Sequence, residues 1–161
     1  MAQVFIGVGS SINRMQNVRL AIQALQDEFG MLRVSKLYES EAVGFSGGNF
    51  YNLVVELHTE CNTQAVVSKL KLIEKKYGRP EKTVKFAPRT LDLDLLLYGQ
   101  KIETEIDLPR AEILKNAFVL KPLSELAPNL KHPILDKTYQ TLWQEYPQKK
   151  QKLWQIELLE P

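Results

Sequence analysis

Two stretches of the chain repeat apolar residues at steps of four, three and four, which is the spacing of one face of an α-helix. These residues are Val18, Ile22, Leu25 and Phe29 in the first stretch and Val66, Leu70, Ile73 and Tyr77 in the second. Asn13 is a start signal and Gly30 a stop signal for the first helix. The spacing predicts two amphipathic helices, at 13–30 and 63–78, and each must bury one face against another layer.

Four short apolar runs flank these helices and predict strands at 3–8, 31–38, 50–57 and 91–98. The order strand, helix, strand, strand, helix, strand is the split β-α-β arrangement. We therefore expect an α+β fold: a ferredoxin-like β-α-β-β-α-β antiparallel sheet with both helices packed on one face. A helix at 138–146 and a strand at 153–158 would be extra C-terminal elements, while 149–152 is interpreted as a solvated turn. Residues 1–161 are treated as one domain.

The charge of the chain is nearly balanced, at +2, which gives no reason to expect a nucleic acid or a membrane as partner. No apolar run approaches the length of a membrane span, and Met1 leads into Val4-Phe5-Ile6 without the basic segment of a signal peptide. Cys61 is the single cysteine, so an internal disulfide is excluded. We expect a cytoplasmic protein.

The positive charge is concentrated between positions 71 and 89, which hold seven basic and two acidic residues. Such a segment is either a solvated helix face that continues into a loop or a binding site for a polyanion. The charge alone does not decide between these two interpretations.

The last predicted strand carries two acidic residues at alternate positions, Asp92 and Asp94, between Leu91, Leu93 and Leu95. Because side chains alternate across a strand, the carboxylates share one face and the leucines the other. We expect a central strand, where repulsion and desolvation both act against the carboxylates unless a divalent cation binds them. Paired carboxylates suit Mg²⁺, although from this pattern alone a solvated acidic face is an equally good interpretation.

The residues around this pair extend the pattern. Positions 85–96 read Lys-Phe-Ala-Pro-Arg-Thr-Leu-Asp-Leu-Asp-Leu-Leu, which resembles the signature of the 6-hydroxymethyl-7,8-dihydropterin pyrophosphokinase family. Further matches are Gly9-Ser10, Tyr38, Phe50-Tyr51-Asn52, Glu74, Gly78-Arg79, Phe118-Val119-Leu120, Pro122-Leu123 and Ala127-Pro128. The resemblance covers nearly the whole chain. It implies an enzyme of folate biosynthesis that transfers pyrophosphate from ATP to the hydroxymethyl group of a pterin and leaves AMP.

The resemblance also implies roles for individual residues. Two Mg²⁺ ions would be held between the ATP phosphates by Asp92 and Asp94. Catalytic roles fall to Arg79, Arg89, Asp92 and Asp94. ATP binding falls to Glu74, Arg79, Lys85, Arg89 and Arg110. The pterin would be bound by Ser40, Val43, Phe50, Asn52 and Phe118, with the two phenylalanines on either side of its ring. ATP and a hydroxymethyl-dihydropterin are the expected partners of a monomer that binds neither nucleic acid nor membrane.

Five positions depart from the family pattern. Arg110 stands where a His is usual, Ala111 where an aromatic residue is frequent, Asn116 and Glu81 where arginines occur, and Phe86 where a Trp is usual. Arg110 keeps a phosphate donor and adds a permanent charge.

Two alternatives stay open from the sequence. The changed positions allow a slow or non-catalytic relative that binds pterin or ATP. A ferredoxin-like sheet could also bind nucleic acid, with Phe50 as a stacking residue. Asp92 and Asp94 argue against nucleic acid, because without a metal they would repel a phosphate backbone.

Overall fold

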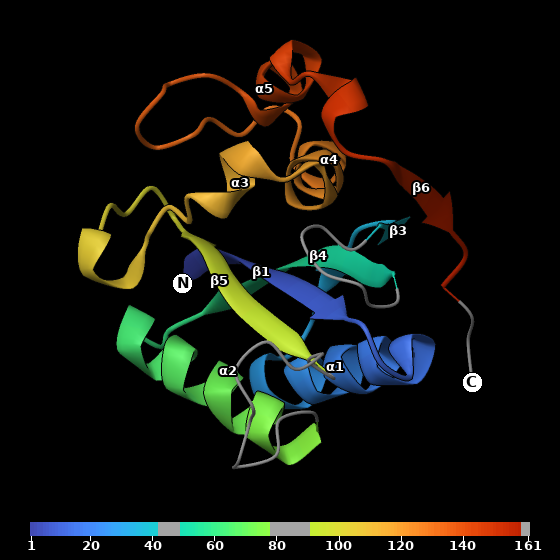
Figure 1. Ribbon diagram of the computed structural model, residues 1–161. Coiled ribbons are helices and arrows are strands. Elements are labelled where there is room, and N and C mark those ends of the chain that lie inside the picture. The colour runs from blue at the N-terminus through green and yellow to red at the C-terminus, as the bar shows by residue number, and fades with distance from the viewer. Residues whose placement is uncertain (42–48, 78–90, 159–161) are drawn as a thin grey trace.

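Helices cover both faces of one antiparallel sheet (Figure 1). The computed structural model describes residues 1–41, 49–77 and 91–158. Within them the strands are β1 (Ala2–Ser10), β2 (Arg33–Val34), β3 (Leu37–Ser40), β4 (Phe50–Thr59), β5 (Asp92–Tyr98) and β6 (Leu153–Ile156). The α-helices are α1 (Arg14–Phe29), α2 (Thr63–Tyr77), α3 (Glu112–Lys115), α4 (Ala117–Leu126) and α5 (Tyr139–Glu145), and the 3₁₀-helices are η1 (Thr104–Ile106) and η2 (Gln148–Lys150).

The strands run in the order β5-β1-β4-β3-β6, and β2 also pairs with β4. Each of these pairs is antiparallel, which confirms the predicted α+β class. The first helix lies between its predicted signals: it follows Asn13 and ends at Gly30, whose φ of 87° suits a residue without a side chain. The C-terminal helix and strand are present, and β6 extends the sheet beyond β3.

The single strand predicted at 31–38 is wrong, because the segment forms two short strands. Val34 pairs with Val55 of β4, whereas Tyr38 pairs with Asn52, so the register shifts by one residue between them. Ser35 causes the break: its hydroxyl oxygen accepts the Val54 N–H at 2.9 Å, a bond that a strand neighbour would otherwise take.

The expectation that β5 is a central strand is also wrong. In the described sheet β5 lies at one end of the order and pairs with β1. Its outer edge meets α2, where Glu74 Oε2 accepts the Leu93 N–H at 2.8 Å. A buried carboxylate therefore satisfies a backbone donor that an edge strand leaves without a strand partner.

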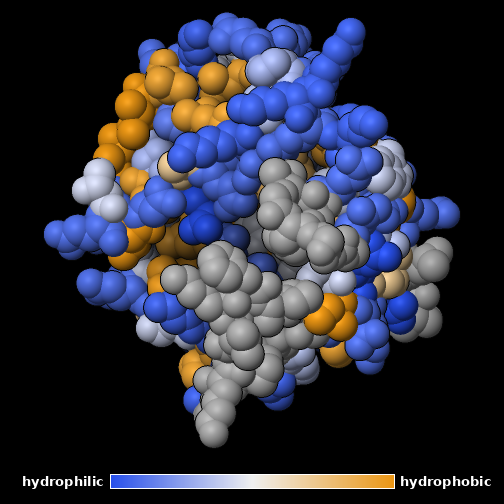
Figure 2. Space-filling model, viewed as in Figure 1, coloured by the Kyte–Doolittle hydropathy of each residue, from blue (hydrophilic) through white to orange (hydrophobic). Residues whose placement is uncertain are grey.

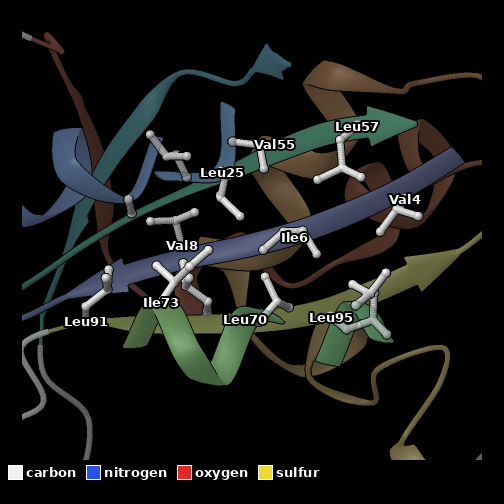
Figure 3. Close-up of a cluster of buried hydrophobic side chains, with 14 of the residues drawn as sticks. Val4, Ile6, Val8, Leu25, Val55, Leu57, Leu70, Ile73, Leu91 and Leu95 are labelled. Atoms are coloured by element: carbon white, nitrogen blue, oxygen red, sulfur yellow. The ribbon is translucent and has the colours of Figure 1, made fainter. Parts of the chain in front are cut away.

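Two buried clusters hold the layers together, one on each face of the sheet. In the first, side chains of β1, β4 and β5, together with Leu91 just before β5, meet α1 and α2. Figure 3 shows this for Val4, Ile6, Val8, Val55, Leu57, Leu91, Leu95, Leu25, Leu70 and Ile73. In the second, α4 and α5 cover the opposite face. Each fully buried aliphatic side chain contributes about 1.5–3 kcal/mol, so α1 and α2 are fixed mainly by this packing.

Figure 2 shows the surface of the face that is turned to the viewer in Figure 1. This face is largely hydrophilic, and hydrophobic residues gather towards its upper left. Ile134 and Leu135, between α4 and α5, are among the exposed large hydrophobic residues. None of the helices in the described segments is both long and apolar enough to cross a bilayer.

We predict that Tyr139→Phe stabilises the protein. Tyr139 is fully buried, and its hydroxyl has no hydrogen-bond partner in the part of the chain that the structure describes. Removing an unsatisfied hydroxyl should raise the free energy of unfolding by about 1 kcal/mol. Tyr146→Phe is the matched control, because that hydroxyl donates to the Lys115 carbonyl at 2.8 Å, and its loss should cost about 1 kcal/mol. Urea unfolding measures both, and destabilisation by Tyr139→Phe would contradict the argument.

Candidate functional site

Burial along β5 follows the alternation predicted from its sequence. Leu91, Leu93 and Leu95 belong to the cluster beneath α1 and α2. Asp92 and Asp94 are half-buried and line a cleft on the opposite face. The strand therefore presents both carboxylates in one place, as the alternating pattern predicts.

This cleft has a volume of about 380 Å³ and lies between the sheet and the α3–α4 segment. Its floor comes from β1, β4 and β5. Its opposite wall comes from α3, from Asn116 directly after α3, and from α4. The lining residues are Gly7, Val8, Gly9, Glu41, Phe50, Asn52, Leu53, Val54, Asp92, Asp94, Leu96, Glu112, Asn116, Phe118 and Val119. The volume is in the range of small-molecule sites, and the mixture of aromatic and polar groups is typical of them.

Three of the residues predicted to bind the pterin line this cleft. Phe50 and Asn52 come from β4, and Phe118 comes from α4 on the other side of the cleft. Ser40 is buried at the end of β3 and is not among the lining residues; its hydroxyl accepts from Asn52 Nδ2 at 3.5 Å. Gly9 leaves room for Asn52, since a Cβ at this position would lie 2.8 Å from Asn52 Oδ1.

Arg110 lies in a second pocket, of about 370 Å³, together with Glu74 and Asp94. Asp94 lines both pockets. Arg110 Nη2 is 3.5 Å from Asp94 Oδ1, and Arg110 Nε donates to Glu112 Oε2 at 3.0 Å. A third carboxylate, of Asp107, lies 3.9 Å from Arg110 Nη1. The carboxylates of Asp94, Asp107 and Glu112 thus hold the guanidinium beside the acidic pair of β5.

The environment of Asp94 disfavours its charged form. Burial raises the pKa of this carboxyl to about 6. The Arg110 guanidinium opposes the shift, whereas the carboxylates of Glu112, Asp92 and Glu74 add to it. Without a cation, negative charge at this end of the cleft is therefore costly.

The donor set fits a hard divalent cation. Asp92 and Asp94 offer carboxylate oxygens from one strand face, and a neighbouring positive charge would relieve the unfavourable ionisation of Asp94. Mg²⁺ is often held by one or two carboxylates and completes its shell with waters and substrate phosphates. The described residues contain no cluster of three or more His, Cys, Asp or Glu side chains suited to a metal.

Several predicted residues fall outside the described ranges: Val43, Arg79, Glu81, Lys85, Phe86 and Arg89. Glu74 is described, but its carboxylate bonds to the backbone of β5, and its predicted role in ATP binding stays a prediction. Sequence reasoning missed Glu112, which lines the cleft two positions after Arg110, and Gln151, which bonds to Asn116. The sequence offered a clue to Glu112, because this carboxylate lies among Arg110, Ala111 and Asn116, where the chain departs from the family pattern. It offered none to Gln151.

The chain matches known proteins over most of its length. The family model described as 7,8-dihydro-6-hydroxymethylpterin-pyrophosphokinase matches residues 5–128. An Aquifex aeolicus protein named 2-amino-4-hydroxy-6-hydroxymethyldihydropteridine pyrophosphokinase is 38% identical over 141 residues, which are 85% of this chain and 88% of that protein. A folate synthesis bifunctional protein of Arabidopsis thaliana is 36% identical over 129 residues, or 77% of this chain and 27% of the plant protein.

A solved structure has the same fold at low identity. The Plasmodium falciparum HPPK-DHPS crystal structure aligns with a TM-score of 0.70 and 14% identity, over 90% of this chain and 44% of that one. The chain therefore spans less than half of the Plasmodium protein and about a quarter of the Arabidopsis protein.

We predict that Asp94→Asn stabilises the metal-free protein near neutral pH but not in acid. A carboxyl whose folded pKa is raised makes the fold lose stability as pH rises from its unfolded pKa, near 4, through about 6. At pH 7.5 with EDTA the free energy of unfolding of the variant should be about 1 kcal/mol higher than that of the wild type. This is less than the pKa shift alone would give, because solvent screens the part-exposed carboxylate. At pH 4.5 most of this gain should vanish. Urea unfolding at both values is the measurement, and equal gains at the two pH values would refute the ionisation of Asp94 as their cause.

Proposed function

The chain belongs to the 7,8-dihydro-6-hydroxymethylpterin-pyrophosphokinase family, and from this premise we propose how its residues carry out the transfer. It is an ATP-dependent pyrophosphokinase of folate synthesis. In the reaction the hydroxymethyl group of 6-hydroxymethyl-7,8-dihydropterin gives up its hydroxyl proton to water, and its oxygen bonds to the β-phosphorus of ATP. The bond between that phosphorus and the oxygen of the α-phosphate breaks, and AMP leaves. One observation carries the proposed roles: a single cleft contains aromatic side chains from two layers and the paired carboxylates of β5.

We assign the pterin to the end of the cleft formed by β4 and α4. A flat aromatic ligand is bound well between aromatic faces, which Phe50 and Phe118 supply from opposite walls. Asn52 can pair with the donors and acceptors of the ring edge, and Ser40 contacts the same amide. Val43 keeps its predicted role in this pocket as an expectation.

The polyphosphate is assigned to the Asp92 and Asp94 end. These carboxylates would hold magnesium, for which two ions are proposed, and the metal would supply the positive charge that neutralises the phosphates. Arg110, beside Asp94, is proposed as a phosphate donor. Arg79, Lys85 and Arg89 remain predicted donors from the segment between α2 and β5.

The chain's own contribution to the rate is then positioning and charge complementarity. Phosphoryl transfer asks little covalent chemistry of the protein, so holding the hydroxyl in line with the β-phosphorus is the main task.

We also infer a ferredoxin-like core. The strands predicted at 3–8, 31–38, 50–57 and 91–98 correspond to β1, β3, β4 and β5, which lie side by side in the order β5-β1-β4-β3. A monomeric state and a cytoplasmic location stay predictions from the sequence.

The test of this proposal is AMP release from ATP with and without 6-hydroxymethyl-7,8-dihydropterin. We expect release that depends on the pterin and on Mg²⁺, and that is abolished by Asp92→Ala and by Asp94→Ala while both variants remain folded. Arg110→Ala should lower turnover roughly 30- to 1,000-fold, the loss expected for one charge-assisted contact to the transition state. Pterin affinity should stay nearly unchanged. Binding of both substrates by the wild type without AMP release would instead support a non-catalytic relative.

A second prediction concerns the pterin pocket. Gly9→Ala places a methyl group where it collides with Asn52 Oδ1, so the amide must move. The pterin dissociation constant should rise roughly 3- to 10-fold, as for the loss of one hydrogen bond. In an Asn52→Ala background the same change should have little further effect, because the colliding atom is gone. Calorimetric titration of pterin into the wild type, the two single variants and the double variant measures these dissociation constants. An equal loss of affinity in both backgrounds would show that Gly9 does not act through Asn52.

A further inference from the structure

A continuous line of hydrogen bonds connects Arg110 with the start of α4. Arg110 Nε donates to Glu112 Oε2 at 3.0 Å, and Asn116 Nδ2 donates to Glu112 Oε1 at 2.9 Å. On the other side of Asn116, its Oδ1 accepts from Gln151 Nε2 at 2.9 Å. Gln151 Oε1 then accepts the backbone N–H of Ala117 at 2.8 Å. We call these four side chains, Arg110, Glu112, Asn116 and Gln151, the relay.

The direction of every bond in the relay is fixed by its two ends. Arg110 can only donate, so the Glu112 carboxylate accepts from it. Glu112, as a carboxylate, also requires the amide nitrogen of Asn116, which turns Asn116 Oδ1 towards Gln151. The Ala117 N–H can only donate, so it requires the carbonyl oxygen of Gln151 and independently gives the same orientation. Reversing either amide would therefore place two acceptors or two donors face to face.

The relay joins parts of the chain that are distant in sequence. Arg110 lies 3.5 Å from Asp94 of β5 at one end, whereas Gln151 lies between η2 and β6 at the other. Gln151 Nε2 is also 3.5 Å from the carbonyl of Lys115, which Tyr146 contacts as well. The segment expected to be a solvated turn thus holds the connection between α3 and α4.

Both ends of the relay reach groups with proposed roles in the reaction. Arg110 faces Asp94, and the first turn of α4 carries Phe118 one position after Ala117. Glu112 and Asn116 line the cleft themselves, while Gln151 does not. A side chain outside the cleft can therefore influence the placement of a guanidinium at its far end.

We propose that Glu112 and Gln151 are positioning residues for the pyrophosphate transfer: Gln151 orients Asn116, Asn116 and Glu112 orient the guanidinium of Arg110, and the guanidinium is thereby aimed at the phosphates. This inference rests on the role proposed for Arg110 as a phosphate donor. A long cationic side chain loses considerable rotamer freedom when it is held in one place. A relay that fixes it before ATP binds removes that cost from the reaction.

Gln151→Glu tests the relay with a minimal change. The new carboxylate can still accept the Ala117 N–H, so α4 and Phe118 should keep their places. It cannot donate to Asn116 Oδ1, and a reversed Asn116 would turn its oxygen against Glu112. Gln151→Ala removes both bonds, and Gln155→Ala is the matched control, since Gln155 lies exposed on neighbouring β6.

For Gln151→Glu we expect kcat/KM for ATP to fall roughly 3- to 10-fold, the factor for one neutral hydrogen bond. Pterin affinity should change less than twofold, whereas Gln151→Ala should weaken it as well. In an Arg110→Ala background, Gln151→Glu should have almost no further effect on turnover, because the group that the relay positions is absent. Gln155→Ala should resemble the wild type.

An NMR measurement reports the relay without reference to activity. The Arg110 Nε–H resonance, assigned by its loss in Arg110→Ala, should exchange slowly with water in the wild type and faster in Gln151→Glu. If the Arg110 Nε–H exchanged at the same rate in Gln151→Glu as in the wild type, the relay would not hold Arg110 in place, and the proposal would be overturned. Equal losses of turnover with and without Arg110 would overturn the positioning role. Full activity of Arg110→Ala would overturn the phosphate role proposed for Arg110, and the resonance would still decide whether the relay exists.

Discussion

The burial of three leucines at alternate positions determines which face of the sheet carries the acidic pair. Leu91, Leu93 and Leu95 pack beneath α1 and α2, and the pleat of β5 then leaves Asp92 and Asp94 on the other face. A shift of one residue would bury both carboxyl groups in the apolar layer, at a cost that is a large fraction of the stability of a domain. The same packing that stabilises the sheet thus also fixes the register of the acidic pair.

The cleft above this pair depends on the second buried layer. α4 packs on β4 and β3, which places Phe118 opposite Phe50 and forms a wall facing β5. The wall is joined to the C-terminal segment by hydrogen bonds at Lys115, Asn116 and Ala117. A cleft wall made of short helices needs such fixed connections, because a four-residue helix such as α3 has little stability of its own.

What the sequence predicted depends on how local each signal is. The two long helices and the faces of Asp92 and Asp94 follow from periodicity, and Phe50, Asn52 and Phe118 follow from family motifs. The break at Ser35 and the edge position of β5 were missed, because a hydroxyl that replaces a ladder bond and the order of strands leave no periodic trace. Gln151 was missed for a similar reason: its partners lie 34 to 36 positions away.

The charges in the cleft determine how the proposed site would bind a substrate that is itself an anion. Glu41, Asp92, Asp94 and Glu112 line the cleft, and the lining residues that the structure describes include no basic side chain. A free polyphosphate would add negative charge beside a carboxyl that already ionises reluctantly, and it would be repelled. A magnesium complex brings the compensating charge with it, so the carboxylates that weaken the metal-free fold would favour the metal-bound nucleotide. Loss of stability at the proposed site and selectivity for a metal-bound substrate would then have the same physical origin.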